Sequence, residues 1–217
     1  MTGCCRAGPC EQVFRPRIAR RALERYRRRG PDELELGMMQ AALDTGIDGA
    51  RVLEIGGGLG TIGSELLAAG AAESEVVELV AAWEPYALEL ARERGLEGQT
   101  RFRVVDILDR PGEVEPADLV VLNRVVCCTP DGVALTAEAA SHARRALVLS
   151  FPRDVFWVRA AMRGLNAGMW LLRRSYRAFV HPPAALLAAA EAKGLRPAAD
   201  GRRGVVWQYA ALTRPRP

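Results

Sequence analysis

The chain has 217 residues, and 49% of them are hydrophobic, which favours one folded globular domain over a disordered chain. Its formal net charge is only +4, with Lys193 as the single lysine, so charge alone assigns no function. No stretch reaches the roughly 18 apolar residues that a membrane span needs, and the N-terminus lacks the apolar core of a signal peptide. We therefore expect a cytoplasmic protein without a membrane span.

Five cysteines occur in the chain, and this odd number with two adjacent pairs does not indicate a disulfide framework. Three of them, Cys4, Cys5 and Cys10, lie in residues 1–12, which we expect to form a flexible tail. Their spacing is not that of a zinc site, so we predict no metal. The remaining residues, 13–217, are expected to form a single domain.

Residues 13–45 are predicted to form two helices that lie over the sheet ahead of its first strand. The first runs from about Ile18 to Arg29, with one apolar face and many arginines, and Gly30-Pro31 ends it. The second covers residues 32–43. An arginine-rich helix is able to bind RNA, but acidic residues elsewhere balance its charge, so nucleic acid is not the expected partner.

The rest of the chain is organised around the stretch RVLEIGGGLGTIG, residues 51–63. Its apolar run is typical of a buried parallel strand. The glycines that follow allow a sharp turn and a close approach to a ligand, and residues 61–69 have helical spacing. A strand, a glycine turn and a helix N-terminus in this order predict a nucleotide-binding cradle.

Two nucleotide cofactors fit this cradle. Gly58, Gly60 and Gly63 match the dinucleotide fingerprint, and Glu78 follows 20 residues after Gly58. Two acids favour S-adenosylmethionine over NAD. Glu54 stands two residues before the first glycine, where it is able to reach a cationic amino-acid ligand, and Asp106 ends the later apolar run FRVVD.

The segment Glu54-Ile55-Gly56-Gly57-Gly58-Leu59-Gly60 resembles motif I of the class I S-adenosylmethionine-dependent methyltransferases. This resemblance implies an α/β, Rossmann-like fold: a seven-stranded, mostly parallel sheet with an antiparallel C-terminal hairpin strand and helices on both faces. It implies S-adenosylmethionine as the cofactor and methyl transfer to a small-molecule acceptor at O, N or S. The implied cofactor-binding residues are Glu54, Gly56, Gly58, Gly60, Glu78, Leu79, Asp106, Ile107 and Asn123.

The positions of two of these acids also follow from the expected elements. Glu78 ends a strand predicted over 75–79, where a carboxylate is able to accept hydrogen bonds from two ribose hydroxyls. Glu84 is a weaker alternative, because it lies in a helical turn. Asp106 follows a strand predicted over 100–105. Further strands are predicted over 118–122, 146–151, 195–200 and 205–212, and further helices over 86–94, 134–145 and 184–193.

In this family the end of the fourth strand lines the space between the cofactor methyl group and the substrate. Residues 153–181 are longer than a simple connection and are predicted to form a lid over the substrate pocket. The predicted substrate contacts are Arg124, Cys127, Cys128, Arg153 and Tyr26. His181 and Tyr176 in the lid are the candidate catalytic residues, with His181 as a general base or substrate-orienting group.

Two alternative functions stay open. Arsenite methyltransferases also place a cysteine just beyond the fourth strand, so Cys127 and Cys128 are compatible with a thiol- or metalloid-directed methyltransferase. A non-catalytic protein that binds S-adenosylmethionine, or RNA through the helix of residues 15–29, is the second alternative. Residues 4–29, together with NRVVCCTPD, SFPRD and FVHPP, also resemble a bacterial subgroup of the family without an assigned acceptor. The order of parts after the fifth strand is distantly similar to the magnesium-protoporphyrin O-methyltransferases.

Overall fold

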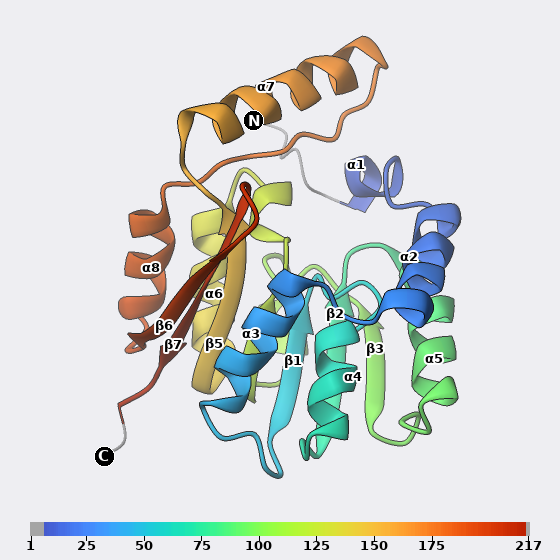
Figure 1. The fold of residues 1–217 in the computed structure, drawn as a ribbon, viewed down its shortest axis with the longest axis vertical. Coiled ribbons are helices and arrows are strands. Elements are labelled where there is room, and N and C mark those ends of the chain that lie inside the picture. The colour runs from blue at the N-terminus through green and yellow to red at the C-terminus, as the bar shows by residue number, and fades with distance from the viewer. Residues whose placement is uncertain (1–6, 216–217) are drawn as a thin grey trace.

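The computed structural model describes residues 7–215, in which seven strands form one sheet. The strands are β1 (Arg51–Ile55), β2 (Glu73–Glu78), β3 (Thr100–Val104), β4 (Ala117–Leu122), β5 (Ala143–Pro152), β6 (Arg196–Arg203) and β7 (Trp207–Thr213). Their order across the sheet is β3-β2-β1-β4-β5-β7-β6 (Figure 1). The first five strands are parallel, and β7 runs antiparallel to both β5 and β6. The predicted fold class is confirmed.

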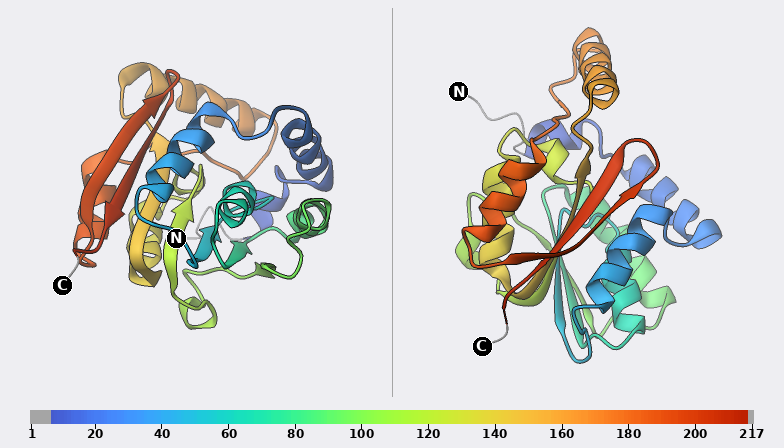
Figure 2. Two further views of the ribbon diagram at one scale, coloured as in Figure 1. Left: turned by 60° about the horizontal axis from the view of Figure 1, so that its bottom comes forward. Right: turned by 60° about the vertical axis from the view of Figure 1, so that its left-hand side comes forward.

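Helices cover both faces of this sheet (Figures 1 and 2). The helices are α1 (Ala7–Glu11), α2 (Pro16–Arg29), α3 (Glu33–Leu43), α4 (Thr61–Ala68), α5 (Glu84–Glu93), α6 (Gly132–His142), α7 (Phe156–Leu171) and α8 (Pro183–Glu191). Apolar residues of α6 and α8 pack with one set of strand residues. Those of α3 and α4 pack with the other set.

The central strands are buried on both faces, which explains their continuous apolar runs. In β4, Val120 and Leu122 face the layer of α6 and α8, whereas Leu119 and Val121 face α3 and α4. Successive side chains of a strand point to opposite faces, so a strand covered on both sides must be apolar throughout. A few buried polar residues interrupt these runs, among them Glu54 in β1, Glu75 in β2 and Ser150 in β5, and Glu54 belongs to the site described below.

The turn after β1 requires glycine for steric reasons. Gly56 has φ of 65°, and a Cβ atom built there would lie 2.3 Å from Cγ2 of Val125. Gly58 also has positive φ, 57°. An L-residue with a side chain is disfavoured in this left-handed region. The turn therefore brings its backbone close to Val125, in the segment that follows β4.

The N-terminal segment is more ordered than we expected from its sequence. Residues 1–12 were predicted to be a flexible tail, but residues 7–11 form α1, and Cys10 is 5% exposed. This corrects the prediction for its described part, because Cys10 packs into the interior instead of extending into solvent. Cys4 and Cys5 lie outside the described residues.

The segment predicted to be a lid, residues 153–181, consists of α7 and an extended return that runs toward α8. Arg174 and Ser175 in this return contact Gln12: the Arg174 guanidinium donates to the Gln12 carbonyl at 3.2 Å, and the Ser175 amide donates to its side chain at 3.1 Å. The N-terminal segment and the return are thus joined although they are far apart in sequence. Within residues 7–215, no helix is both long enough and apolar enough to cross a bilayer.

Candidate functional site

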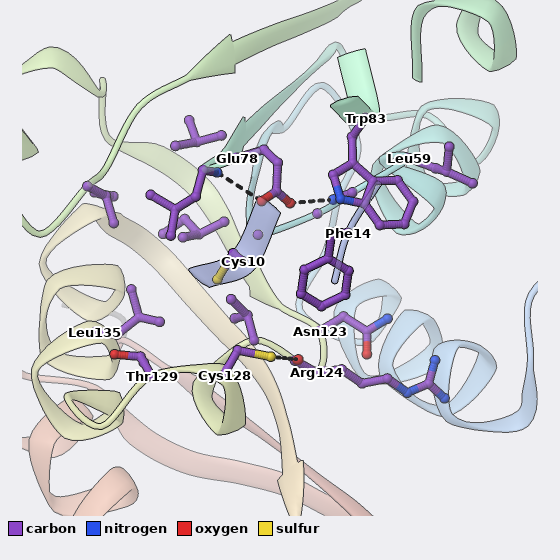
Figure 3. Close-up of a pocket in the computed structure, with 18 of the residues that line it drawn as sticks. Cys10, Phe14, Leu59, Glu78, Trp83, Asn123, Arg124, Cys128, Thr129 and Leu135 are labelled. Atoms are coloured by element: carbon purple, nitrogen blue, oxygen red, sulfur yellow. Dashed lines mark hydrogen bonds between the residues drawn. The ribbon is translucent and has the colours of Figure 1, made fainter. Parts of the chain in front are cut away.

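A cavity of about 270 Å³ lies at the carboxyl ends of the parallel strands. Its wall includes the glycine turn after β1, Glu78 at the end of β2, Asp106 after β3 and Asn123 after β4. Figure 3 shows Glu78, Trp83, Phe14 and Cys128 around this opening. In open α/β sheets ligands bind in the crevice at this edge. The fold therefore brings four of the predicted stretches to one place.

Glu78 is held at the end of β2 by backbone amides. Its carboxylate accepts hydrogen bonds from the amides of Gly58 at 3.1 Å and Leu79 at 2.8 Å, and a longer one from Val80 at 3.4 Å. Burial raises the pKa of Glu78, and these three amides lower it in part. The hydrogen bond from Gly58 ties the carboxylate to the glycine turn, so the acid and the turn form one rigid wall.

Asp106 and Ile107 form the next part of the wall. One carboxylate oxygen of Asp106 accepts a hydrogen bond from the Leu108 amide at 3.0 Å, which closes a turn after β3. Ile107 is 3% exposed and belongs to the core under the cavity. Leu79 also lines the cavity. The carboxylates of Glu78 and Asp106 are thus each followed by an apolar side chain on this side, Leu79 and Ile107.

The opposite end of the cavity is polar, and sequence reasoning missed it. Glu35 and Arg25 line the cavity beside Thr61, whose hydroxyl donates to the Glu35 carboxylate at 3.1 Å. Glu35 also accepts a hydrogen bond from the Asp32 amide at 2.8 Å, which makes a capping box at the start of α3. The pattern Asp32-x-x-Glu35 signals a helix start in the sequence, but nothing local places it over the glycine turn.

Glu54 lies beneath the glycine turn, away from the cavity wall. It is 2% exposed, and its carboxylate accepts a short hydrogen bond from the Gly63 amide at the start of α4. Burial raises the pKa of Glu54 to about 8, and the nearby charge of Glu35 adds to this. The acid predicted to reach a ligand directly therefore supports the turn from below, and Glu35 is the acid that faces the cavity at this end.

The segment after β4 is fixed by a chain of hydrogen bonds. The Arg124 amide donates to the Ser150 hydroxyl at 2.9 Å, and this hydroxyl donates to the Asn123 side-chain oxygen at 3.0 Å. Arg124 adopts a positive φ of 56°, and its guanidinium pairs with Asp32 at 2.7 Å and lies over the Trp207 ring. Asn123 and Arg124 both line the cavity, and Asp32 already engages the Arg124 guanidinium.

Cysteine and tyrosine side chains meet at the cavity mouth. Cys10 and Cys128 line the cavity, and the Cys128 sulfur lies 3.2 Å from the Tyr176 hydroxyl. The Cys127 sulfur is 4.0 Å from that of Cys128 and lies behind the wall. Hydrogen bonding between the two thiols raises the pKa of Cys127, and burial raises it further. The same hydrogen bond lowers the pKa of Cys128. Among the described residues, no group of three or more His, Cys, Asp or Glu side chains is arranged to hold a metal ion.

Two aromatic residues of the mouth were not predicted. Phe14, just before α2, and Trp83, just before α5, line the cavity with ring centroids 6.2 Å apart. Phe14 also meets the Tyr176 ring edge-on at 5.9 Å. The sequence shows neither pair, because the three residues come from segments separated by about 70 or more positions.

Other predicted site residues lie away from the wall. The Tyr26 hydroxyl is engaged by Glu65 and Arg94, between α2 and α4. Arg153 lies over the Trp157 ring. His181 contacts the carbonyl of Thr129, a wall residue, at 2.9 Å. Gly60 begins α4 in a left-handed conformation. These four residues, with Cys127, Tyr176 and Glu54, do not line the cavity.

Several solved structures share this architecture. Magnesium protoporphyrin IX methyltransferase from Synechocystis PCC 6803 with bound SAH superposes with a TM-score of 0.69 at 21% identity, over 94% of this chain and 99% of that one. An O-methyltransferase family protein from Burkholderia thailandensis gives 0.65 at 17% identity, over 93% and 61%. The chain has the fold of the class I methyltransferases.

The fold alone does not fix the reaction. The [4+2]-cyclase SpnF also superposes, with a TM-score of 0.61 at 14% identity, over 83% of this chain and 80% of that one. No protein-family model and no curated protein matches the sequence. Function must therefore be argued from the residues of the cavity.

Proposed function

We propose that the protein transfers a methyl group from S-adenosylmethionine to a small-molecule acceptor. The observation that carries this proposal is the arrangement of Glu78, Asp106 and the glycine turn around one cavity of about 270 Å³. These are the groups that a nucleoside with a charged amino-acid tail requires: hydrogen-bond acceptors for hydroxyls and an amino group, and open backbone beside them.

The residues present fit this cofactor. Glu78 is anchored by backbone amides, and its oxygens face the cavity where ribose hydroxyls are able to donate to them. Asp106 and Ile107 offer an acceptor and an apolar surface for adenine. At the other end, Glu35 and Arg25 supply opposite charges for the ammonium and carboxylate groups of the amino-acid part, and Thr61 supplies a hydroxyl.

S-adenosylmethionine supplies a methyl group that its sulfonium charge already activates. The chain then has to align the acceptor and exclude water. Phe14 and Trp83 close the mouth with apolar surface. Asn123 and Arg124 are fixed by Ser150 and Asp32 at the end of β4, so they present a rigid polar edge to an acceptor.

The two candidate catalytic residues differ in what they are able to do. Burial raises the pKa of Tyr176 well above its usual range, with the neighbouring Cys128 adding to this, so its phenol stays protonated and positions groups by hydrogen bonding. A carbonyl only accepts, so Nε2 of His181 must donate to Thr129. This leaves Nδ1 as the basic nitrogen when the ring is neutral. His181 thus acts on the cavity through the Thr129 backbone.

A thiol- or metalloid-directed methyltransferase is the second candidate, and one observation favours it. Cys10 and Cys128 are 118 positions apart in the sequence, yet both line the cavity. We expect purified protein to show no high-affinity binding of phenylarsine oxide if the acceptor is an ordinary small molecule. Tight binding that is lost in Cys128→Ser would favour the metalloid function instead.

The proposed function is tested in two stages with the full chain. Isothermal calorimetry should detect binding of S-adenosylmethionine and S-adenosylhomocysteine, and no binding of NAD. Release of S-adenosylhomocysteine is then measured across pools of small-molecule acceptors. Binding of NAD in place of S-adenosylmethionine would contradict the proposal, and binding without turnover in any pool would favour a non-catalytic role.

A further inference from the structure

Helix α7 carries an apolar face that nothing in residues 7–215 covers. Val158 is its single buried residue. Phe156, Ala160, Gly164 and Leu171 recur at helical spacing on the side away from Val158, and all four are exposed. Phe156 is 79% and Leu171 75% exposed. Exposed apolar surface gathered on one helix face is typical of interaction sites.

The face extends beyond the helix. Trp170 and Leu172 at its end are 72% and 69% exposed, and Val205, in the turn between β6 and β7, is 70% exposed. The Trp157 indole donates to the Val205 carbonyl at 3.4 Å, which joins the hairpin to the helix. Figures 1 and 2 show α7 standing clear of the two helical layers. We call this surface the α7 face: Phe156, Trp157, Trp170, Leu171, Leu172 and Val205.

The charges around the α7 face have one sign. Residues 153–181 contain six arginines and a single acid, Asp154. Asp154 is already paired with Arg159, at 2.8 Å for one of its two contacts. Arg163 and Arg173 are exposed, and α7 itself contains no acidic residue. An apolar face with tryptophan and phenylalanine, bordered by arginines, is typical of helices that lie in the interface of a membrane.

We propose that the α7 face binds an anionic lipid surface, with α7 lying in the plane of the headgroups. The apolar side chains enter the acyl boundary, and the arginines contact the phosphates of the headgroups. The arginines select this occupant over a second copy of the chain. In a two-fold dimer through α7, Arg159 and Arg163 of one copy would approach those of the other, with only Asp154 to offset them.

This orientation places the cavity mouth near the lipid. The return after α7 contacts Gln12 through Arg174 and Ser175, and Tyr176 in the same return lies beside Cys128 at the cavity wall. Docking of α7 therefore holds the mouth close to the membrane surface. The proposal does not depend on methyl transfer, because membrane binding is measured without cofactor or acceptor.

The test is flotation of the full chain with vesicles of phosphatidylcholine alone or of phosphatidylcholine and phosphatidylglycerol. We expect binding to the vesicles that contain phosphatidylglycerol, and weaker binding as salt increases. The double variant Phe156→Asp/Leu171→Asp should reduce the partition coefficient by more than about tenfold, since two large apolar side chains are lost from the interface. Leu36→Asp/Leu88→Asp, on α3 and α5, is the matched control and should bind like the parent.

Two single substitutions, each removing one positive charge, isolate the electrostatic contribution to vesicle binding. Arg163→Gln should weaken binding about fivefold, whereas Arg92→Gln on α5 should leave it unchanged. The proposal is overturned if the protein ignores both kinds of vesicle at low salt, or binds neutral and anionic vesicles equally. It is also overturned if analytical ultracentrifugation shows a dimer that Phe156→Asp/Leu171→Asp dissociates, since a second copy would then cover the face.

Discussion

The two sides of the cavity are built in different ways. The inner side consists of strand ends and the glycine turn, where Glu78 and Asp106 are held by backbone amides above a continuous core. The outer side is lined by Cys10 of α1 and by Phe14, and the return after α7 packs behind them through a few contacts, such as Arg174 with Gln12 and Tyr176 with Phe14. The inner side is therefore a property of the fold, whereas the outer side depends on segments appended to it. We infer that the inner side binds the cofactor and the outer side sets the acceptor.

The largest effect is expected where the inner side tolerates no side chain. Gly56→Ala should reduce the free energy of unfolding by about 2–4 kcal/mol, because it adds left-handed strain to a clash with Val125. Gly46→Ala has the same kind of φ, 81°, and open space, so it should cost about 1 kcal/mol. Gly98 has neither a left-handed φ nor an atom close to the added Cβ, so the unfolding free energy of Gly98→Ala should be within about 0.5 kcal/mol of the parent. Equal costs at all three positions, measured by urea unfolding, would contradict a tightly built turn.

The second effect concerns the acid of the inner side. Glu78→Gln should weaken binding of S-adenosylhomocysteine by about 2–3 kcal/mol, since charge-assisted hydrogen bonds to two hydroxyls are weakened. Calorimetry measures this loss, and Glu97→Gln, at an exposed acid after α5, is the control. An affinity in Glu78→Gln equal to that of the control would remove Glu78 from the cofactor site.

The third effect is the pH dependence that Glu54 introduces. Its pKa is about 8 in the folded chain against 4.5 for the ordinary carboxyl group, so folding favours the protonated form. The stabilising contribution is present below pH 4.5 and is lost as the pH rises to 8. Glu54→Gln keeps an acceptor for the Gly63 amide and has no such loss.

Unfolding of both proteins in urea at pH 5 and pH 8 measures this contribution. The stability of Glu54→Gln relative to the parent should increase from pH 5 to pH 8 by about 3–4 kcal/mol, at about 1.4 kcal/mol for each pH unit between the two pKa values that this range spans. A constant difference between the two proteins would show that Glu54 titrates normally and is not buried as described.

The smallest effect is expected on the outer side. Tyr176→Phe keeps the ring that packs on Phe14 and removes the hydroxyl beside Cys128. It should leave cofactor affinity unchanged and lower kcat/KM for the acceptor about tenfold, in line with the loss of one hydrogen bond. A large loss of cofactor affinity instead would show that the two sides of the cavity are not separable.

The inner side was largely predictable from the sequence, because its signals are local. The apolar run of β1, the glycines after it and the acids at 78 and 106 each mark the end of one strand, and the topology brings strand ends together. Glu54 shows the limit of this reasoning. A motif fixes the position of an acid along the strand, but not which face of the sheet its side chain enters.

The outer side was predictable only in outline. Residues 153–181 were expected to cover the site, yet α7 itself stands away from it, and only its return reaches the mouth. Phe14, Trp83 and Glu35 were missed because their place at the cavity depends on contacts between distant segments. Cys10 was assigned to a tail, since a short cysteine-containing terminus gives no local sign that it packs inward.

The most direct test of the cofactor site is a crystal structure of the protein soaked with S-adenosylhomocysteine. We expect the nucleoside in the cavity at the strand ends, with both ribose hydroxyls on the Glu78 carboxylate and adenine beside Asp106 and Ile107. An empty cavity at saturating ligand, or a nicotinamide dinucleotide bound there in its place, would contradict the proposed methyltransferase function.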